Sequence, residues 1–186
     1  SAASDVYKRQ FLCGARVETY DLKKENNFLP DFDGIPEEVA RKTKFMIVSY
    51  PLNPVCVAAD DGMYERLIRF AEKYEIIILH DNAYSDIIYD GRKGGSFLAY
   101  EGAKDVGVEF YSLSKSYNLT GARISFVIGN KEIIRKFQTV RSQIDYGVFK
   151  PVQYGAIAAL TGPQDGVISQ CAEYERRNNC LLYTSD

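Results

Sequence analysis

The sequence lacks three features that would assign the protein to a specialised class. Its apolar runs are short: residues 76–79 fall far below the roughly 18 residues that a membrane helix needs. Its 23 basic and 25 acidic residues are interspersed, and the net charge is −2. Because there is neither a basic stripe nor a block of like charge, we expect no membrane or nucleic-acid partner and no disordered charged tail.

Residues that bind metals or form disulfides are also few and scattered. The four cysteines, Cys13, Cys56, Cys171 and Cys180, show no paired spacing, and His80 is the only histidine. This pattern predicts no metal site and reduced thiols in a cytoplasmic protein. The first ten residues, SAASDVYKRQ, contain neither the apolar core of a secretory signal nor an initiator methionine, which suggests a fragment of a longer protein.

What the sequence does contain is an alternation of strand-like and helix-like segments. The 186 residues are 46% hydrophobic and 26% charged, which is ordinary for a globular domain with a real core. Strands are predicted at residues 44–50, 75–81, 108–113 and 122–129, and helices at 60–75, 131–143 and 151–160. The unbroken apolar centre of 75–81 indicates a strand covered on both faces. The alternation predicts an α/β fold in three layers, with a mainly parallel sheet and helices on both faces.

Polar side chains follow three of the predicted strands. Ligands of such folds bind beyond the carboxyl ends of the strands, which makes Asn53, Asp81 and residues 112–115 candidate positions. Asp81 ends an apolar run, so its carboxylate either caps a helix, joins a salt bridge, or faces a protonated ligand nitrogen. Taken alone, Asn53 is typical of a turn and Tyr84 of packing. His80 is expected to be a packed histidine with a backbone partner.

The third of these candidates contains a lysine surrounded by hydroxyls and a guanidinium. In FYSLSKSYNLTGAR (110–123), Lys115 follows Ser112 and Ser114, and Arg123 comes eight positions later (123 − 115 = 8). Arginine offers a bidentate fork to phosphate, and serine hydroxyls can donate to the remaining oxygens. A lysine in such surroundings can act as an amine nucleophile. The segment is therefore either a solvated turn or an anion site with a reactive amine.

Taken together, three motifs resemble the class I and II aminotransferases, the fold-type I enzymes that use pyridoxal 5′-phosphate. The motifs are SYPLNP, DNAYSD and SLSKSYNLTGAR, in that order, with 34 residues from Asp81 to Lys115 (115 − 81 = 34). The resemblance predicts a partial aminotransferase large domain over residues 11–180. GARVETYDL and DYGVFKPVQYGAIAAL look most similar to the LL-diaminopimelate and alanine/aspartate aminotransferase-like branch. Residues 1–10 and 181–186 do not resemble the family, so we expect them to be non-native or disordered.

The resemblance implies catalytic roles for four of these residues. Lys115 is similar to the lysine that forms an imine with pyridoxal phosphate and then moves a proton between substrate and cofactor. Asp81 is similar to the carboxylate that keeps the ring nitrogen protonated, so that the ring can accept electrons. Tyr84 and Asn53 are similar to the two hydrogen-bond partners of the phenolic oxygen of the ring.

The same resemblance implies the phosphate ligands, the substrates and the assembly. Ser112 and Arg123 are similar to phosphate ligands, and Ser114 is a weaker candidate for the same role. The implied reaction moves an amino group between an amino acid and a 2-oxo acid, in a homodimer in which residues 146–151 reach the neighbouring site. A β-eliminating carbon–sulfur lyase would share every motif, and a non-catalytic regulatory domain that senses the cofactor would share the fold.

The chain departs from the family pattern at two places. After Asn53 and Pro54 the family usually continues with Thr-Gly, whereas this chain has Val55 and Cys56; the change is tolerable if Cys56 needs no positive φ. The glycine-rich phosphate loop, the aromatic residue that stacks on the ring and the arginine that grips the substrate carboxylate have no counterpart in these residues. We therefore expect this chain alone to bind cofactor weakly and to be inactive.

Overall fold

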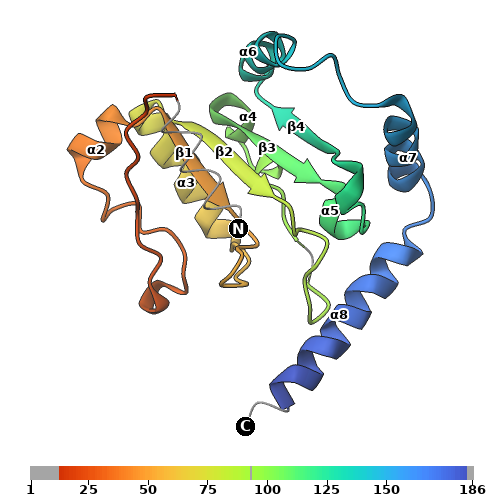
Figure 1. Ribbon diagram of the computed structural model, residues 1–186. Coiled ribbons are helices and arrows are strands. Elements are labelled where there is room, and N and C mark those ends of the chain that lie inside the picture. Colours follow the sequence, from red (N-terminus) through yellow and green to blue (C-terminus); the bar gives the residue numbers. More distant parts are fainter. Residues whose placement is uncertain (1–12, 93, 184–186) are drawn as a thin grey trace.

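The computed structural model describes residues 13–92 and 94–183, which form a four-stranded sheet with helices around it (Figure 1). The strands are β1 (Phe45–Ser49), β2 (Ile77–Asn82), β3 (Gly107–Ser112) and β4 (Ser125–Gly129). The helices are α2 (Glu37–Lys42), α3 (Asp61–Tyr74), α4 (Ala103–Val106), α5 (Leu113–Ser116), α6 (Lys131–Arg141), α7 (Lys150–Thr161) and α8 (Asp165–Tyr183), with 3-10 turns η1 (Lys24–Asn26), η2 (Phe97–Ala99) and η3 (Thr120–Ala122).

The sheet is mainly parallel, as the sequence predicted. Its strand order is β1-β2-β3-β4. The pairs β1–β2 and β2–β3 are parallel, whereas β4 runs antiparallel to β3. The register aligns Asp81 with Ser49 on one side and with Phe110 on the other. The carboxyl ends of β1, β2 and β3 therefore share one edge of the sheet, where a ligand site is expected.

Helix α3 packs on one face of the sheet and builds the main core. It begins after Asp60, whose carboxylate accepts a hydrogen bond from the Met63 amide at 2.6 Å, which is a usual way to cap the start of a helix. Met63, Leu67 and Ala71 are fully buried and belong to one cluster with Val48 of β1. The helix predicted over residues 60–75 is confirmed.

The two faces of the central strand are covered unequally. Along β2, Ile78 and His80 are buried, whereas Leu79 and Asp81 are half-buried. On the more open face, Phe45 at the start of β1 is 58% exposed. The candidate carboxylate Asp81 therefore points to the less covered face of the sheet.

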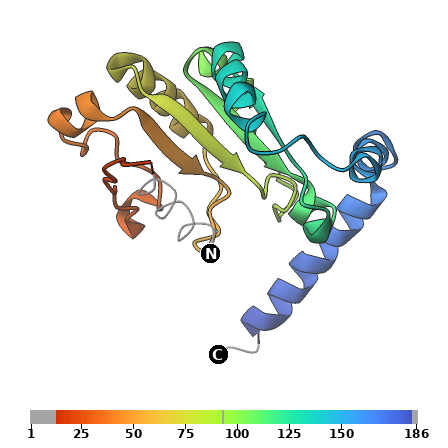
Figure 2. The same ribbon diagram turned by 45° about the horizontal axis from the view of Figure 1, so that its top comes forward.

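Beyond β4 the chain runs through α6 and α7 into α8, which extends past α5 and away from the sheet (Figures 1 and 2). A small second core, made of Leu113, Ile124 and Ala156, joins α5 and the start of β4 to α7. Helices α6 and α7 were predicted, but α8 was not. Several large apolar side chains of this part are exposed: Phe137, Val140, Ile144, Phe149, Tyr154, Ile157, Leu160 and Ile168.

The predicted terminal segments fall partly outside the described residues, which exclude 1–10 and 184–186. Residues 181–183 belong to α8, and a non-native origin of the ends stays a prediction. None of the described helices combines the length and the apolarity that crossing a bilayer requires.

Candidate active site

Three predicted site residues lie at or just beyond the shared carboxyl edge of the sheet. Asn53 lies in the loop after β1, and Asp81 is the next-to-last residue of β2. Ser112 ends β3 and is the N-cap of α5, where its hydroxyl accepts a hydrogen bond from the Ser114 amide at 3.2 Å. This cap starts a short helix directly at the strand end, and that helix carries Lys115.

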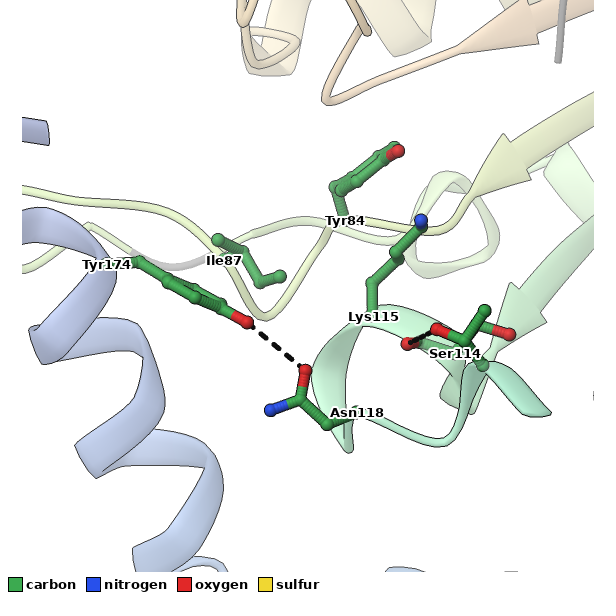
Figure 3. A pocket seen from close by; sticks show the side chains of 7 residues that line it. Tyr84, Ile87, Ser114, Lys115, Asn118 and Tyr174 are labelled. Carbon is green, nitrogen blue, oxygen red and sulfur yellow. Dashed lines mark hydrogen bonds between the residues drawn. The ribbon is translucent and has the colours of Figure 1, made fainter. Parts of the chain in front are cut away.

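The structure brings together Asn53, Tyr84 and Lys115, which are far apart in the sequence. The Asn53 Nδ2 donates a hydrogen bond to the Tyr84 hydroxyl at 3.1 Å. The Lys115 Nζ lies 5.9 Å from the centre of the Tyr84 ring, and Figure 3 shows the amine pointing toward that ring. An amine, a phenol and an amide therefore lie near one another.

A cavity of about 330 Å³ lies beside Lys115. Its lining residues are Tyr84, Ile87, Ser114, Lys115, Asn118, Thr120 and Tyr174. Sequence reasoning found three of them, Tyr84, Ser114 and Lys115, and missed the others. Tyr174 could not have been found from local pattern, because it comes from α8, far along the chain (Figure 3).

The predicted phosphate ligands belong to one closed loop. The Thr120 hydroxyl donates to the Ser114 carbonyl at 3.0 Å, and Arg123 Nη1 donates to the Thr120 carbonyl at 3.3 Å. Arg123 itself has a left-handed backbone, with φ of 53°. Its exposed guanidinium has no ion-pair partner among the residues that the structure describes. The loop thus carries a free cation and two hydroxyls, which is the donor set that a phosphate needs.

Asp81 is a half-buried carboxylate without a partner. Burial raises its pKa above the ordinary value, and the neighbouring His80 acts in the opposite direction. Its carboxylate makes no hydrogen bond or ion pair within 13–92 and 94–183, so the alternatives of a helix cap and a salt bridge are not seen. Asp81 is not among the residues that line the cavity. A ligand cation would offset the cost of burying this charge.

Behind Asp81, a buried polar network joins β2, β3 and α3. His80 Nδ1 lies 3.0 Å from Glu109 Oε2, and His80 Nε2 lies 3.1 Å from the Tyr64 hydroxyl. Glu109 also accepts hydrogen bonds from the Ser96 hydroxyl and from the Phe97 amide. Burial raises the pKa of Glu109, but these hydrogen bonds outweigh it and the net shift is downward. The histidine is packed, as expected, although its partners are side chains rather than backbone.

Asp86 anchors the segment that carries Tyr84. Its Oδ2 accepts hydrogen bonds from the Tyr111 hydroxyl at 2.5 Å and from the Ser116 hydroxyl at 2.6 Å. Burial, reinforced by the hydrogen bond to Asp86, raises the pKa of Tyr111. Asp86 therefore ties the loop after β2 to β3 and α5, a role that the sequence did not indicate.

The departure from the family pattern at Cys56 proves to be strained. Cys56 has a φ of 59°, in the left-handed region that favours glycine. The condition under which we expected the change to be tolerated is therefore not met. The turn is closed by hydrogen bonds from the Cys56 amide to the Leu52 carbonyl at 2.5 Å and from its thiol to the Pro54 carbonyl at 3.4 Å.

None of the four cysteines, all of which lie within the described residues, forms a disulfide. In the part of the chain that the structure covers, no three side chains of the His, Cys, Asp and Glu types come together in a way that could hold a metal ion.

Comparisons with known proteins identify the family of the chain. The chain matches the model of the family "Aminotransferase class I and II" over residues 7–179. Among curated proteins it is 44% identical over 178 residues to the LL-diaminopimelate aminotransferase of Halothermothrix orenii, covering 95% of this chain and 46% of that protein. It is also 44% identical over 171 residues to the enzyme of that name from Dehalococcoides mccartyi, covering 92% of this chain and 44% of that protein. The chain therefore spans less than half the length of these relatives.

Solved structures share the fold. The substrate-bound structure of BacF from Bacillus subtilis superposes with a TM-score of 0.88 at 36% identity, covering 90% of this chain and 42% of that one. A probable N-succinyldiaminopimelate aminotransferase from Thermus thermophilus gives a TM-score of 0.87 at 33% identity, covering 92% of this chain and 46% of that one. These neighbours confirm the predicted fold class, that of the fold-type I aminotransferases. With the family model matched over nearly the whole chain, the protein belongs to the class I and II aminotransferases.

Proposed function

We propose that the protein is a pyridoxal-phosphate-dependent aminotransferase, which moves an amino group between an amino acid and a 2-oxo acid. The observation that carries the proposal is the convergence of the Lys115 amine with the Asn53–Tyr84 pair, 5.9 Å from the Tyr84 ring centre. Because relatives at 44% identity are LL-diaminopimelate aminotransferases, LL-diaminopimelate is the first amino donor to test.

The residues present fit the cofactor. Pyridoxal phosphate carries an aldehyde, a phenolic oxygen, a protonated ring nitrogen and a phosphate. This chain offers an amine at Lys115 and hydrogen-bonding groups at Tyr84 and Asn53. It also offers a half-buried carboxylate at Asp81 that has no polar partner among the residues that the structure describes. For the fourth group, the phosphate, one loop of the chain offers the hydroxyls of Ser112 and Ser114 and the guanidinium of Arg123.

When bound, the cofactor supplies an electron sink for the bond broken at the substrate α-carbon. The residues of this chain would hold and orient the cofactor. Lys115 would provide the amine that holds the cofactor aldehyde and a group that can carry a proton. Asp81 holds a positive charge on the ring nitrogen, because a half-buried carboxylate stabilises a cation beside it. Tyr84 and Asn53 orient the phenolic side of the ring, and Arg123 neutralises phosphate charge.

The test of the proposal is covalent trapping on Lys115. The chain is mixed with pyridoxal phosphate, reduced with borohydride and mapped by mass spectrometry. We expect the label on Lys115 and its loss in Lys115→Ala, whereas Lys136→Ala, which changes an exposed lysine of α6, should keep it. Labelling spread over surface lysines, or equal labelling in Lys115→Ala, would refute the proposal.

The reaction outcome is decided on a chain extended to the length of its relatives. With an amino donor and 2-oxoglutarate, glutamate formation supports transfer. Release of pyruvate and ammonia without an acceptor would instead assign the protein to the lyases, and cofactor binding without either reaction would favour a sensing domain.

We further propose a homodimer that uses α6 and α7. The support is a set of exposed apolar side chains on these helices and on the segment between them. Ile144 at 77% and Phe149 at 72% exposure lie in that segment, and Ile157 of α7 is 55% exposed. Apolar surface of this density marks an interaction site.

A further inference from the structure

Helix α8 contacts both segments that carry the candidate active site. In Figures 1 and 2 it lies beside α5 and projects beyond the sheet. The polar contacts described below come from one stretch of the helix, residues 170–175. Gln170 and Tyr174, four residues apart, form one strip of its surface, and Cys171 and Glu175 form the adjacent strip of the same broad face. That face therefore meets the Lys115 loop and the Tyr84 loop together, so the helix can set the distance between them.

The first group of contacts holds the end of α5. Gln170 Nε2 donates to the Lys115 carbonyl at 3.0 Å, and its Oε1 accepts from Asn118 Nδ2 at 2.5 Å. The Tyr174 hydroxyl donates to Asn118 Oδ1 at 3.1 Å (Figure 3). Both ends of the Asn118 amide are thus bound by α8. The last carbonyls of a helix have few partners within that helix. The Lys115 carbonyl accepts a long backbone hydrogen bond from the Asn118 amide at 3.4 Å, and Gln170 adds a second, closer donor.

Asn118 is a residue whose backbone needs such support. Its φ is 52°, in the left-handed region, which costs most residues about 1–2 kcal/mol and which asparagine tolerates better than most. The turn at Asn118 directs the chain from Lys115 toward the phosphate loop. Contacts that fix the side chain of Asn118 therefore help to fix the direction in which α5 presents its lysine.

The second group of contacts holds the segment after Tyr84. The Cys171 thiol donates to the Ile88 carbonyl at 3.4 Å, and a Glu175 oxygen accepts from the Asp90 amide at 2.8 Å. These residues neighbour Gln170 and Tyr174 on the same face of α8. The helix therefore bridges the two walls of the cavity, and Tyr174 is itself part of the lining.

We propose that Gln170 and Tyr174 are positioning residues for Lys115. This inference rests on the proposed function. By fixing Asn118 and the Lys115 carbonyl, they keep the Lys115 amine against Tyr84, where it bonds the aldehyde carbon of the cofactor with release of one water. Without these contacts the loop samples other conformations, and the fraction of chains with a correctly placed amine falls.

The experiment compares Tyr174→Phe and Gln170→Met with the wild-type chain. The matched control is Tyr183→Phe, which removes the same hydroxyl from a residue of α8 that is 91% exposed. Two quantities are measured: the rate of borohydride-trappable bond formation with pyridoxal phosphate across pH, and hydrogen exchange of the amides of residues 113–118 without cofactor. Because one hydrogen bond contributes about 1 kcal/mol, we expect each test variant to lose about fivefold in rate and to gain about fivefold in exchange.

Each outcome decides a separate question. If both test variants match Tyr183→Phe in rate and in exchange, the inference is overturned while the proposed function stands. If the variants lose rate only in proportion to a fall in unfolding midpoint, with unchanged local exchange, the role is merely structural and the inference is also overturned. If the wild-type chain forms no bond on Lys115, the proposed function fails. In that case, equal hydrogen exchange of the amides of residues 113–118 in Tyr174→Phe and Tyr183→Phe overturns the inference as well.

Discussion

Replacing Glu109 by glutamine should destabilise the protein, because it removes a buried charge that several donors need. One oxygen of Glu109 accepts from the Phe97 amide at 2.9 Å, lies 3.0 Å from His80 Nδ1 and accepts from the Ser96 hydroxyl at 3.1 Å. Glutamine keeps the shape and one carbonyl oxygen, but it loses the charge. A hydrogen bond to a charged group contributes about 1 kcal/mol more than a neutral one, so three such bonds predict a loss of about 3 kcal/mol.

The same substitution should change how stability depends on pH. Hydrogen bonds hold the pKa of Glu109 below its ordinary value of 4.5 in the folded state. The unfolded chain therefore binds more protons than the native chain as the pH falls below that value, and native stability is lost in this window. Above it the contribution of Glu109 is fully present. In Glu109→Gln there is no carboxyl to protonate, so this part of the acid-induced loss should disappear.

The assay is urea unfolding followed by far-ultraviolet circular dichroism and by tyrosine fluorescence, since the sequence has 14 tyrosines and no tryptophan. Free energies of unfolding are compared at neutral pH and in steps below 4.5. Glu101→Gln, at an exposed position, is the control, and surface changes of this kind usually stay within about 0.5 kcal/mol. If Glu109→Gln costs no more than the control, or keeps the wild-type acid dependence, the reasoning about this network is wrong.

Two further predictions concern the Asn53 loop and the exposed apolar surface. Cys56→Gly should raise the free energy of unfolding by about 1 kcal/mol, because glycine adopts the left-handed φ without strain; an unchanged midpoint in thermal unfolding would contradict this. Ile157→Glu, at a position on α7 that is 55% exposed, should convert the proposed dimer to a monomer in sedimentation velocity while leaving the unfolding midpoint nearly unchanged. A wild-type monomer, or a variant that still dimerises, would remove α7 from the interface.

The parts of the fold that sequence predicted are those with a strong local pattern. Helix α3 has an acidic cap at Asp60 and a buried row at Met63, Leu67 and Ala71, and both are readable from spacing alone. The direction of β4 was not predicted, because an apolar strand pattern is the same in either direction. Only eight residues, 114–121, separate the two predicted strands, and a parallel crossover needs a dozen or more residues. The length of this connection therefore indicates an antiparallel β4.

Helix α8 was missed for a different reason. Its contacts with the rest of the protein are polar and come from residues such as Gln170 and Tyr174, which are 55 and 56 positions from their partners Lys115 and Asn118. A helix fixed by a few hydrogen bonds carries no continuous apolar stripe, so periodicity gives little sign of it. Only the folded chain reveals which amide meets which carbonyl.

The candidate site shows the same division at the level of single residues. Pattern alone left Asn53 as a turn and Tyr84 as packing, and only the resemblance paired them; the structure joins them by a hydrogen bond at 3.1 Å. Residues that react must have particular chemical groups, and such groups form motifs. Residues that hold them, such as Asp86 and Gln170, need only supply a donor or acceptor at the right point, and many residue types can do that. Positioning residues are therefore harder to recognise in a sequence than reacting residues. For this reason the residues that position Lys115 were found only from the geometry of the folded chain.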